Sequence, residues 1–221
     1  MTSPELRSNP VESFPGYGRR IAKYWPAKMI GTTVGMVVFF VVYFWILRHP
    51  LSTPTLMPLT AVDRWIAFSP ASLAVYLSLW FYVSLAPALL TDPAQLWRYL
   101  TGTITLATIG LGIFFIWPTS TPSSIVDWSL YPAFAFMKGV DASGNACPSL
   151  HAGFAVFSAL WFARIFRDSH ASAGMRLANW SWCLGILYST IATRQHVFVD
   201  ILAGSALGAL IGAWSLRARS V

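Results

Sequence analysis

The sequence contains few charged residues. Asp, Glu, Lys and Arg together make up 10% of its 221 residues, whereas soluble globular domains contain about 25%. Hydrophobic residues make up 56% of the chain. This composition excludes an ordinary soluble domain and predicts an all-α, integral multi-pass membrane protein. We expect one membrane-embedded domain over residues 29–216, preceded by a cytoplasmic segment, 1–28, and followed by a cytoplasmic tail, 217–221.

The sequence also lacks clustered cysteines and a continuous basic stretch. Its two cysteines, Cys147 and Cys183, have no CxxC pattern or Cys/His cluster around them, so neither a disulfide framework nor a zinc site is expected. The net charge is +7, but the basic residues do not form the aromatic-interleaved surface that nucleic-acid binding requires. We therefore expect no nucleic-acid partner, no metal and no cofactor.

Apolar segments are abundant. A membrane-spanning helix needs about 20 mostly apolar residues, and six segments are predicted to be such helices: 29–47, 71–90, 97–117, 150–166, 178–194 and 197–214. The last two are separated only by a short polar run, which predicts a tight turn. The sequence therefore predicts a bundle of six transmembrane helices.

The distribution of basic residues predicts the orientation of this bundle, because Lys and Arg accumulate in cytoplasmic segments. With the N-terminus inside, only Arg48, Arg64, Lys138 and Arg194 lie in outer segments, and the other 11 of the 15 basic residues lie inside (15 − 4 = 11). Both termini are therefore expected to be cytoplasmic. We expect the protein itself to lie in the inner (cell) membrane of a bacterium.

Two long outer loops, 48–70 and 118–149, are expected to be functional or mobile. Lys138 and Asp141, in the second loop, are interpreted as ordinary solvated charges. Gly204, Gly208 and Gly212 place a small residue at every fourth position of the last segment. Such spacing lets another helix approach closely, so we assign these glycines to packing.

His196 and Asp200 form the first candidate catalytic pair. A carboxylate within an apolar helix is costly and marks a functional site by default. The spacing of four residues puts both side chains on one helix face, where Asp200 can orient the imidazole. This arrangement suits a nucleophilic histidine, with one ring nitrogen held and the other free to attack an electrophile.

A second cluster comprises Pro148, Ser149 and His151. Pro148 and Ser149 are typical of a helix start, where free N–H groups and the helix dipole attract anions. Ser149 and the neighbouring amides could therefore hold phosphate oxygens, while His151 acts as the general acid. Between residues 151 and 196 the chain is predicted to cross the membrane twice, which returns both histidines to the outer face.

Arg194 lies two residues before His196, and its guanidinium suits phosphate. It is our predicted phosphate-binding cation. Arg194 in isolation is more typical of an interfacial anchor, and Pro-Ser-x-His in isolation occurs easily by chance. The conjunction of these features at one membrane face favours a site.

These residues resemble the type 2 phosphatidic acid phosphatase-like (PAP2) superfamily. Its signatures include a Pro-Ser-x-His block, matched by Pro148, Ser149 and His151. A later Ser-Arg-x5-His-x3-Asp block is matched by Ser189, His196 and Asp200. The resemblance implies a metal-independent phosphoesterase in which His196 becomes phosphorylated, and it adds Ser189 to the expected phosphate-binding residues.

Two departures from the family pattern concern its cations. Thr190 stands where the second block has arginine, and the segment 116–123 contains no basic residue where an earlier Lys-x6-Arg-Pro block is expected. This loss makes the chain look more like the branch of inositolphosphorylceramide and sphingomyelin synthases, which transfer phospho-headgroups between lipids.

Two enzymatic functions therefore stay open. One is hydrolysis of a lipid phosphate or diphosphate monoester, such as phosphatidate or a polyprenyl diphosphate, at the periplasmic or exterior face. The other is transfer of a phospho-headgroup to a lipid alcohol. A haem protein and a transporter are rival classes, but the first leaves Asp200 unexplained and the second is disfavoured by the lack of a sequence repeat.

Overall fold

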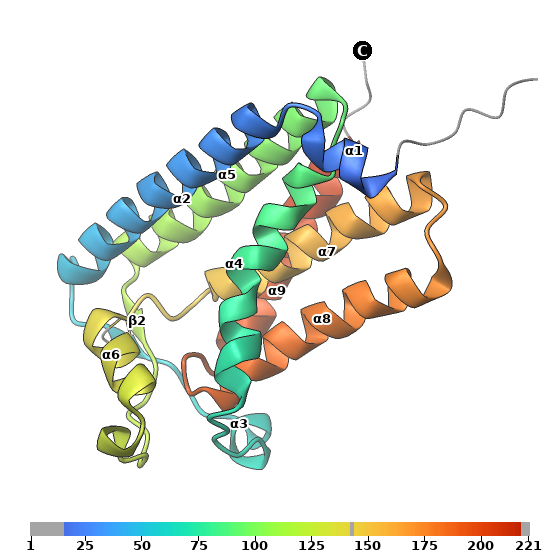
Figure 1. The fold of residues 1–221 in the computed structure, drawn as a ribbon. Helices are drawn as coiled ribbons and strands as arrows, with labels where there is room; N and C mark the ends of the chain where they lie inside the picture. Colours follow the sequence, from blue (N-terminus) through green and yellow to red (C-terminus); the bar gives the residue numbers. More distant parts are fainter. Residues whose placement is uncertain (1–15, 142–143, 218–221) are drawn as a thin grey trace, which may run out of the picture.

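The computed structural model of the chain describes residues 16–141 and 144–217. Residues 1–15 of the expected cytoplasmic N-terminal segment and residues 218–221 of the expected cytoplasmic tail lie outside it. All six predicted apolar segments are helical (Figure 1): α2 (Trp25–Arg48), α4 (Ser72–Ala88), α5 (Pro93–Ile116), α7 (Leu150–Asp168), α8 (Ala173–Ala192) and α9 (Phe198–Arg217). A short helix, α1 (Tyr17–Ala22), precedes them.

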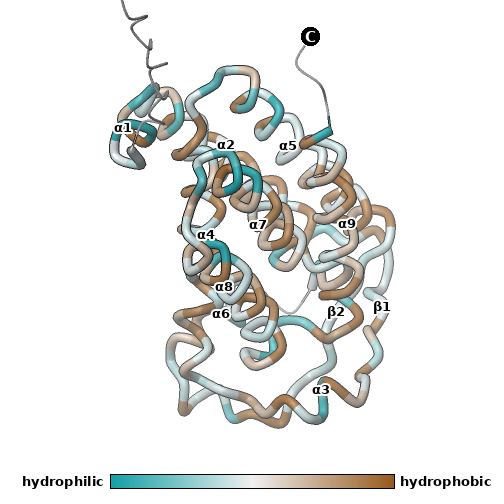
Figure 2. Tube along the Cα trace, turned by 90° about the vertical axis from the view of Figure 1, so that its right-hand side faces the viewer, coloured by the Kyte–Doolittle hydropathy of each residue, from teal (hydrophilic) through white to brown (hydrophobic). Residues whose placement is uncertain are grey.

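Only some of the six are candidate membrane spans. By length and composition, α2, α5 and α9 could each cross a membrane, whereas α4 is apolar but has only 17 residues. Hydrophobic residues recur along α2, α5 and α9 in Figure 2. The structure thus supports a helical membrane protein with three candidate spans. Crossing by α4, α7 and α8, and the cytoplasmic placement of the termini, stay predictions.

Helix α7 is the central helix of the bundle. It packs against α4, α5, α8 and α9, and 13 of its 19 residues are buried. Ser149 is its N-cap, with a side-chain oxygen that accepts a hydrogen bond from the Ala152 amide at 3.2 Å. The predicted helix start at Pro148 and Ser149 is therefore confirmed.

The contact between α7 and α9 depends on glycine. A Cβ atom at Gly204 would overlap the carbonyl oxygen of Ser149, and one at Gly208 would overlap the carbonyl oxygen of Gly153. At Gly212 a Cβ atom would lie 2.8 Å from the Leu160 side chain. The predicted packing role of these glycines is confirmed, since they let the two backbones touch.

The two long loops are folded against each other at one end of the bundle (Figure 1). The first contains β1 (Thr55–Leu56) and α3 (Ala61–Trp65); the second contains β2 (Thr119–Ser120), a 3₁₀ helix, η1 (Trp128–Leu130), and α6 (Pro132–Asp141). Strands β1 and β2 pair in parallel. This end also carries the starts of α7 and α9, so we call it the histidine end.

Candidate active site

His151 and His196 line the same cavity, of about 190 Å³. The two histidines therefore converge on one cavity, while their expected location at the outer membrane face stays a prediction. The wall of the cavity is mostly aromatic, with side chains from α2, α4, α5, α6 and α7: Phe39, Phe40, Tyr43, Phe44, Tyr76, Trp80, Phe114, Phe136 and Phe154. No Lys or Arg is among the described residues that line it. The site thus combines two imidazoles with an apolar wall.

His196 is fixed through its ring nitrogen Nδ1. This nitrogen lies 3.1 Å from the carbonyl oxygen of Ala146, which can only accept, so Nδ1 carries the proton of a neutral ring. The remaining ring nitrogen, Nε2, then carries a free lone pair. The side chain is 12% exposed, so it is mostly enclosed while still lining the cavity.

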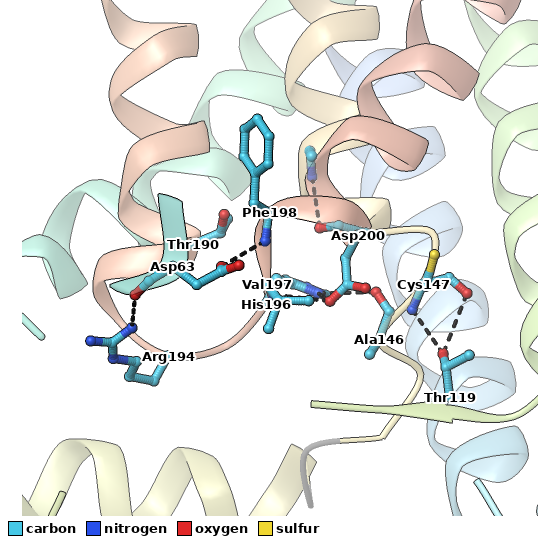
Figure 3. Close-up of polar contacts among 12 residues, drawn as sticks. Asp63, Thr119, Ala146, Cys147, Thr190, Arg194, His196, Val197, Phe198 and Asp200 are labelled. Atoms are coloured by element: carbon cyan, nitrogen blue, oxygen red, sulfur yellow. Dashed lines mark hydrogen bonds and ion pairs between the residues drawn. The ribbon is translucent and has the colours of Figure 1, made fainter. Parts of the chain in front are cut away.

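Asp200 differs from the expectation that it holds the imidazole. Its Oδ2 lies 3.7 Å from His196 Nδ1, too far for a hydrogen bond, and accepts instead from the Val197 amide at 3.0 Å. The reason is local, because Asp200 is the third residue of α9 and caps the start of its own helix. The fully buried carboxylate therefore acts on His196 as a nearby charge (Figure 3).

His151 is packed more tightly than His196. Its ring stacks on Tyr76 with centroids 4.0 Å apart, and its Nε2 lies 3.0 Å from the Tyr76 carbonyl oxygen. Since that oxygen can only accept, Nε2 donates the bond and Nδ1 is the nitrogen left for a substrate. The start of α7 is joined to α9 by a hydrogen bond from the Ser149 amide to the Asp200 carbonyl, 2.9 Å long.

The expected phosphate-binding residues lie apart from the cavity lining. Pro148 and Ser149 are buried at the start of α7, and the hydroxyl of Ser189 donates to the Ile186 carbonyl within α8 at 2.6 Å. None of these three is among the residues that line the cavity. Their expected contacts with phosphate stay predictions.

Arg194 is engaged elsewhere. Its guanidinium donates to the backbone carbonyls of Asp63 and Ile66, each at 3.0 Å, and the close-up shows it directed toward α3 (Figure 3). It does not line the cavity. These contacts give no support to the expected role as the phosphate-binding cation, which stays a prediction, because two of the five N–H donors of the guanidinium bond to carbonyls.

Lys138 corrects a further expectation. It is not an ordinary solvated charge, since its Nζ donates to the Arg194 carbonyl at 2.9 Å and lies 5.6 Å from the centroid of the Trp128 ring. The side chain of Asp141, given the same interpretation, lies outside the described part of the chain.

The sequence reasoning missed two residues that support the site. Asp63 is 3% exposed, and its Oδ1 accepts from the Phe198 amide at 2.8 Å. The buried Thr119 hydroxyl accepts from the Cys147 amide at 2.8 Å, next to the Ala146 carbonyl that His196 contacts (Figure 3). A Thr60-x-x-Asp63 capping-box pattern was the only signal for Asp63, and nothing in the sequence marked Thr119.

Burial also affects the Cys147 thiol, which lies next to the Asp200 carboxylate. Desolvation, followed by the charge of Asp200, raises the pKa of Cys147 to about 11. Both cysteines are free and buried. Among the described residues, no group of three or more His, Cys, Asp or Glu side chains could hold a metal ion.

Comparison with known proteins agrees with these observations. The model of the PAP2 superfamily matches residues 115–220, a range that contains both motif blocks. No curated protein and no solved structure matches the chain. Members of the superfamily are phosphoesterases or related phosphotransferases, so the match indicates a function of that type. The resemblance seen in the motifs is therefore confirmed over residues 115–220, the part of the chain that the PAP2 superfamily model matches.

Proposed function

We propose that the protein is an integral membrane phosphatase that hydrolyses a lipid phosphate or diphosphate monoester through a phosphohistidine at His196. The observation that carries the proposal is the shared cavity, where two histidines meet an aromatic wall. An apolar wall suits the chain of a lipid, since burial of apolar surface is favourable. The imidazoles provide the two groups that phosphoryl transfer through a covalent intermediate requires.

In the first step, Nε2 of His196 attacks phosphorus. An N–P bond forms, the P–O bond to the lipid breaks, and the departing oxygen takes a proton from Nδ1 of His151, which enters this step protonated on both ring nitrogens. The Ala146 carbonyl supports this step because its contact with Nδ1 leaves Nε2 as the free nitrogen. The negative charge of Asp200, 3.7 Å from Nδ1, stabilises the positive charge that develops on the ring.

In the second step, water attacks the phosphohistidine. Nδ1 of His151 takes the proton of the water, the N–P bond breaks, and phosphate leaves. His151 is suited to both steps because the stack on Tyr76 and the bond to its carbonyl fix the ring. The reaction is proposed to occur at the outer face of the membrane.

Transfer of a phospho-headgroup to a lipid alcohol is the second candidate. It is favoured by the lack of Lys and Arg among the described residues that line the cavity. Catalysis of phosphoryl transfer depends mainly on positioning and charge stabilisation, and a phosphodiester carries less charge than a monoester. In this version an alcohol replaces water in the second step.

The test compares the detergent-purified protein with His196→Ala and His151→Ala, in the presence of a chelator. His170→Ala is the matched control, because His170 is exposed. Substrates are phosphatidate, a polyprenyl diphosphate, and a phospholipid with ceramide or diacylglycerol as acceptor. We expect free phosphate from the wild type and His170→Ala only.

Formation of a new phospholipid without free phosphate would instead establish the transferase. Activity that persists in His196→Ala would contradict the assignment of the nucleophile. Loss of activity on addition of the chelator would contradict metal independence.

A further inference from the structure

The turn that carries His196 is held by segments far away in the sequence. Arg194 has a φ of 57°, a left-handed conformation that is uncommon for residues other than glycine. Its side chain reaches the carbonyls of Asp63 and Ile66, and its own carbonyl accepts from Lys138. Contacts from α3 and α6 thus hold a backbone conformation that is unfavourable in isolation.

Asp63 joins the ends of two helices. Its Oδ2 accepts from the Thr60 amide and hydroxyl, both at 2.7 Å, which caps α3. Its Oδ1 accepts from the Phe198 amide at 2.8 Å, at the start of α9. A carboxylate is favoured there because the N-terminus of a helix carries a partial positive charge. Each oxygen therefore serves a different helix.

The position of His196 depends on these contacts. Residues on both sides of it are held: Arg194 by α3 and α6, Val197 by Asp200, and Phe198 by Asp63. The contacts made by Asp63 and Ile66 come from outside residues 115–220, and the Asp63 side chain is almost fully buried. A displacement of Phe198 would move the ring of His196 relative to the cavity.

We propose that Asp63 is a positioning residue for His196, and that α3 clamps the turn at residues 194–198 through Asp63 and Arg194. The inference rests on the proposed role of His196 but assigns no contact with substrate to Asp63. A neutral amide cannot replace the carboxylate, since asparagine has one acceptor oxygen and an NH2 group. Whichever way that amide is oriented, the NH2 group faces an N–H donor at one of the two helix ends.

The experiment compares wild type, Asp63→Asn and Asp127→Asn. Asp127 is the matched control, because it caps a short helix and, among the described residues, its hydrogen bonds come from Ser129. The first measurement is the rate at which diethylpyrocarbonate modifies each histidine, followed by peptide mass spectrometry. Exposed His49 and His170 are internal references.

We expect Asp63→Asn to raise the modification rate of His196 severalfold, with His49 and His170 unchanged and Asp127→Asn equal to wild type. The second measurement is the single-turnover rate constant for phosphorylation of His196, which does not depend on the fraction of active protein. It is expected to fall roughly 10- to 100-fold in Asp63→Asn, because small displacements of reacting groups are costly.

Unchanged reactivity and an unchanged rate constant in Asp63→Asn would overturn the proposal, and so would equal increases at all three histidines. If the wild type turns over no phosphorylated lipid, the proposed function fails, whereas selective exposure of His196 still supports the clamp. If Asp63→Asn does not fold, Thr60→Ala removes one donor to the same carboxylate. A smaller, selective rise at His196 is then expected, and its absence would count against the clamp.

Discussion

Helices α9 and α2 both contain glycines spaced four residues apart, yet the surroundings of those glycines are opposite. At Gly204 and Gly208 of α9, an added Cβ atom would overlap the backbone of α7. At Gly31 and Gly35 of α2, nothing lies within 4 Å of such an atom. Only 6% of the most apolar 18-residue stretch of α2 is buried inside the structure. The same spacing therefore marks a close helix contact in one place and an exposed surface in the other.

The difference shows where the fold is specified most strictly. Close approach of α7 and α9 brings the start of one helix to the start of the other. His151 and Asp200 lie in these first turns, and His196 lies two residues before α9. Helix α2 contributes aromatic side chains to the cavity wall but presents much of its surface outward. Substitutions should be costly near the α7–α9 contact and mild on α2.

Glycine substitutions should have the largest effect. We expect Gly204→Ala and Gly208→Ala each to lower the free energy of unfolding by about 1–3 kcal/mol, because the overlapped atoms belong to a backbone that cannot rotate away. Activity should also fall, because a wider spacing between α7 and α9 would separate His151 from His196. Gly31→Ala and Gly35→Ala should stabilise by up to about 1 kcal/mol. Unfolding in detergent and turnover of the four variants measure the contrast, and similar effects in both helices would refute it.

Arg194→Ala should have the next largest effect. If Arg194 positions the turn, kcat falls roughly tenfold or more while KM stays unchanged. If it binds phosphate, KM rises. Steady-state kinetics separate the two roles, with Arg64→Ala as the control because Arg64 is exposed on α3. A raised KM with unchanged kcat would restore the phosphate-binding assignment.

Thr119→Val should have a moderate effect. The substitution leaves the buried Cys147 amide without its acceptor, which costs about 1–3 kcal/mol, and it loosens the segment whose Ala146 carbonyl fixes His196. Thr105→Val is the matched control, since the Thr105 hydroxyl bonds only to the Thr101 carbonyl within α5. Equal stability and kcat in the two variants would contradict a supporting role for Thr119.

The smallest effect concerns the reactivity of Cys147. Because burial and the Asp200 charge raise its pKa to about 11, the reactive thiolate is scarce at neutral pH. In a Cys183→Ser background, the rate of alkylation by iodoacetamide should increase about tenfold per pH unit up to this pKa. If the alkylation rate instead reaches a plateau near pH 8.5, the pKa of a free cysteine, the histidine end is open to water.

The sequence allowed the helices and the two histidines to be predicted because these depend on local or periodic signals. Apolar runs located all six helices, and Pro148 with Ser149 located the start of α7. The four-residue spacing in α9 identified the packing glycines, although the same spacing in α2 shows that the partner is not encoded in the pattern.

Contacts between distant segments could not be predicted. Asp63 reaches Phe198 and Arg194 reaches Ile66 only because two loops fold back on the start of α9. The spacing predicted that His196 and Asp200 lie close together, as they do, but His196 precedes α9 and so shares no helix face with Asp200. The spacing also did not predict that the Val197 amide and the Ala146 carbonyl would compete for the two side chains. Lys138 was likewise predicted to be solvated, because its acceptor, the Arg194 carbonyl, lies in another loop.

The central claim is that His196 attacks phosphorus from a cavity shared with His151. The most direct test is a rapid-quench reaction of the wild type with a lipid phosphate labelled at phosphorus, followed by peptide mapping under alkaline conditions. We expect an acid-labile phosphoryl group on His196 alone, absent from His196→Ala. Turnover without any labelled protein, or label on a different residue, would contradict it.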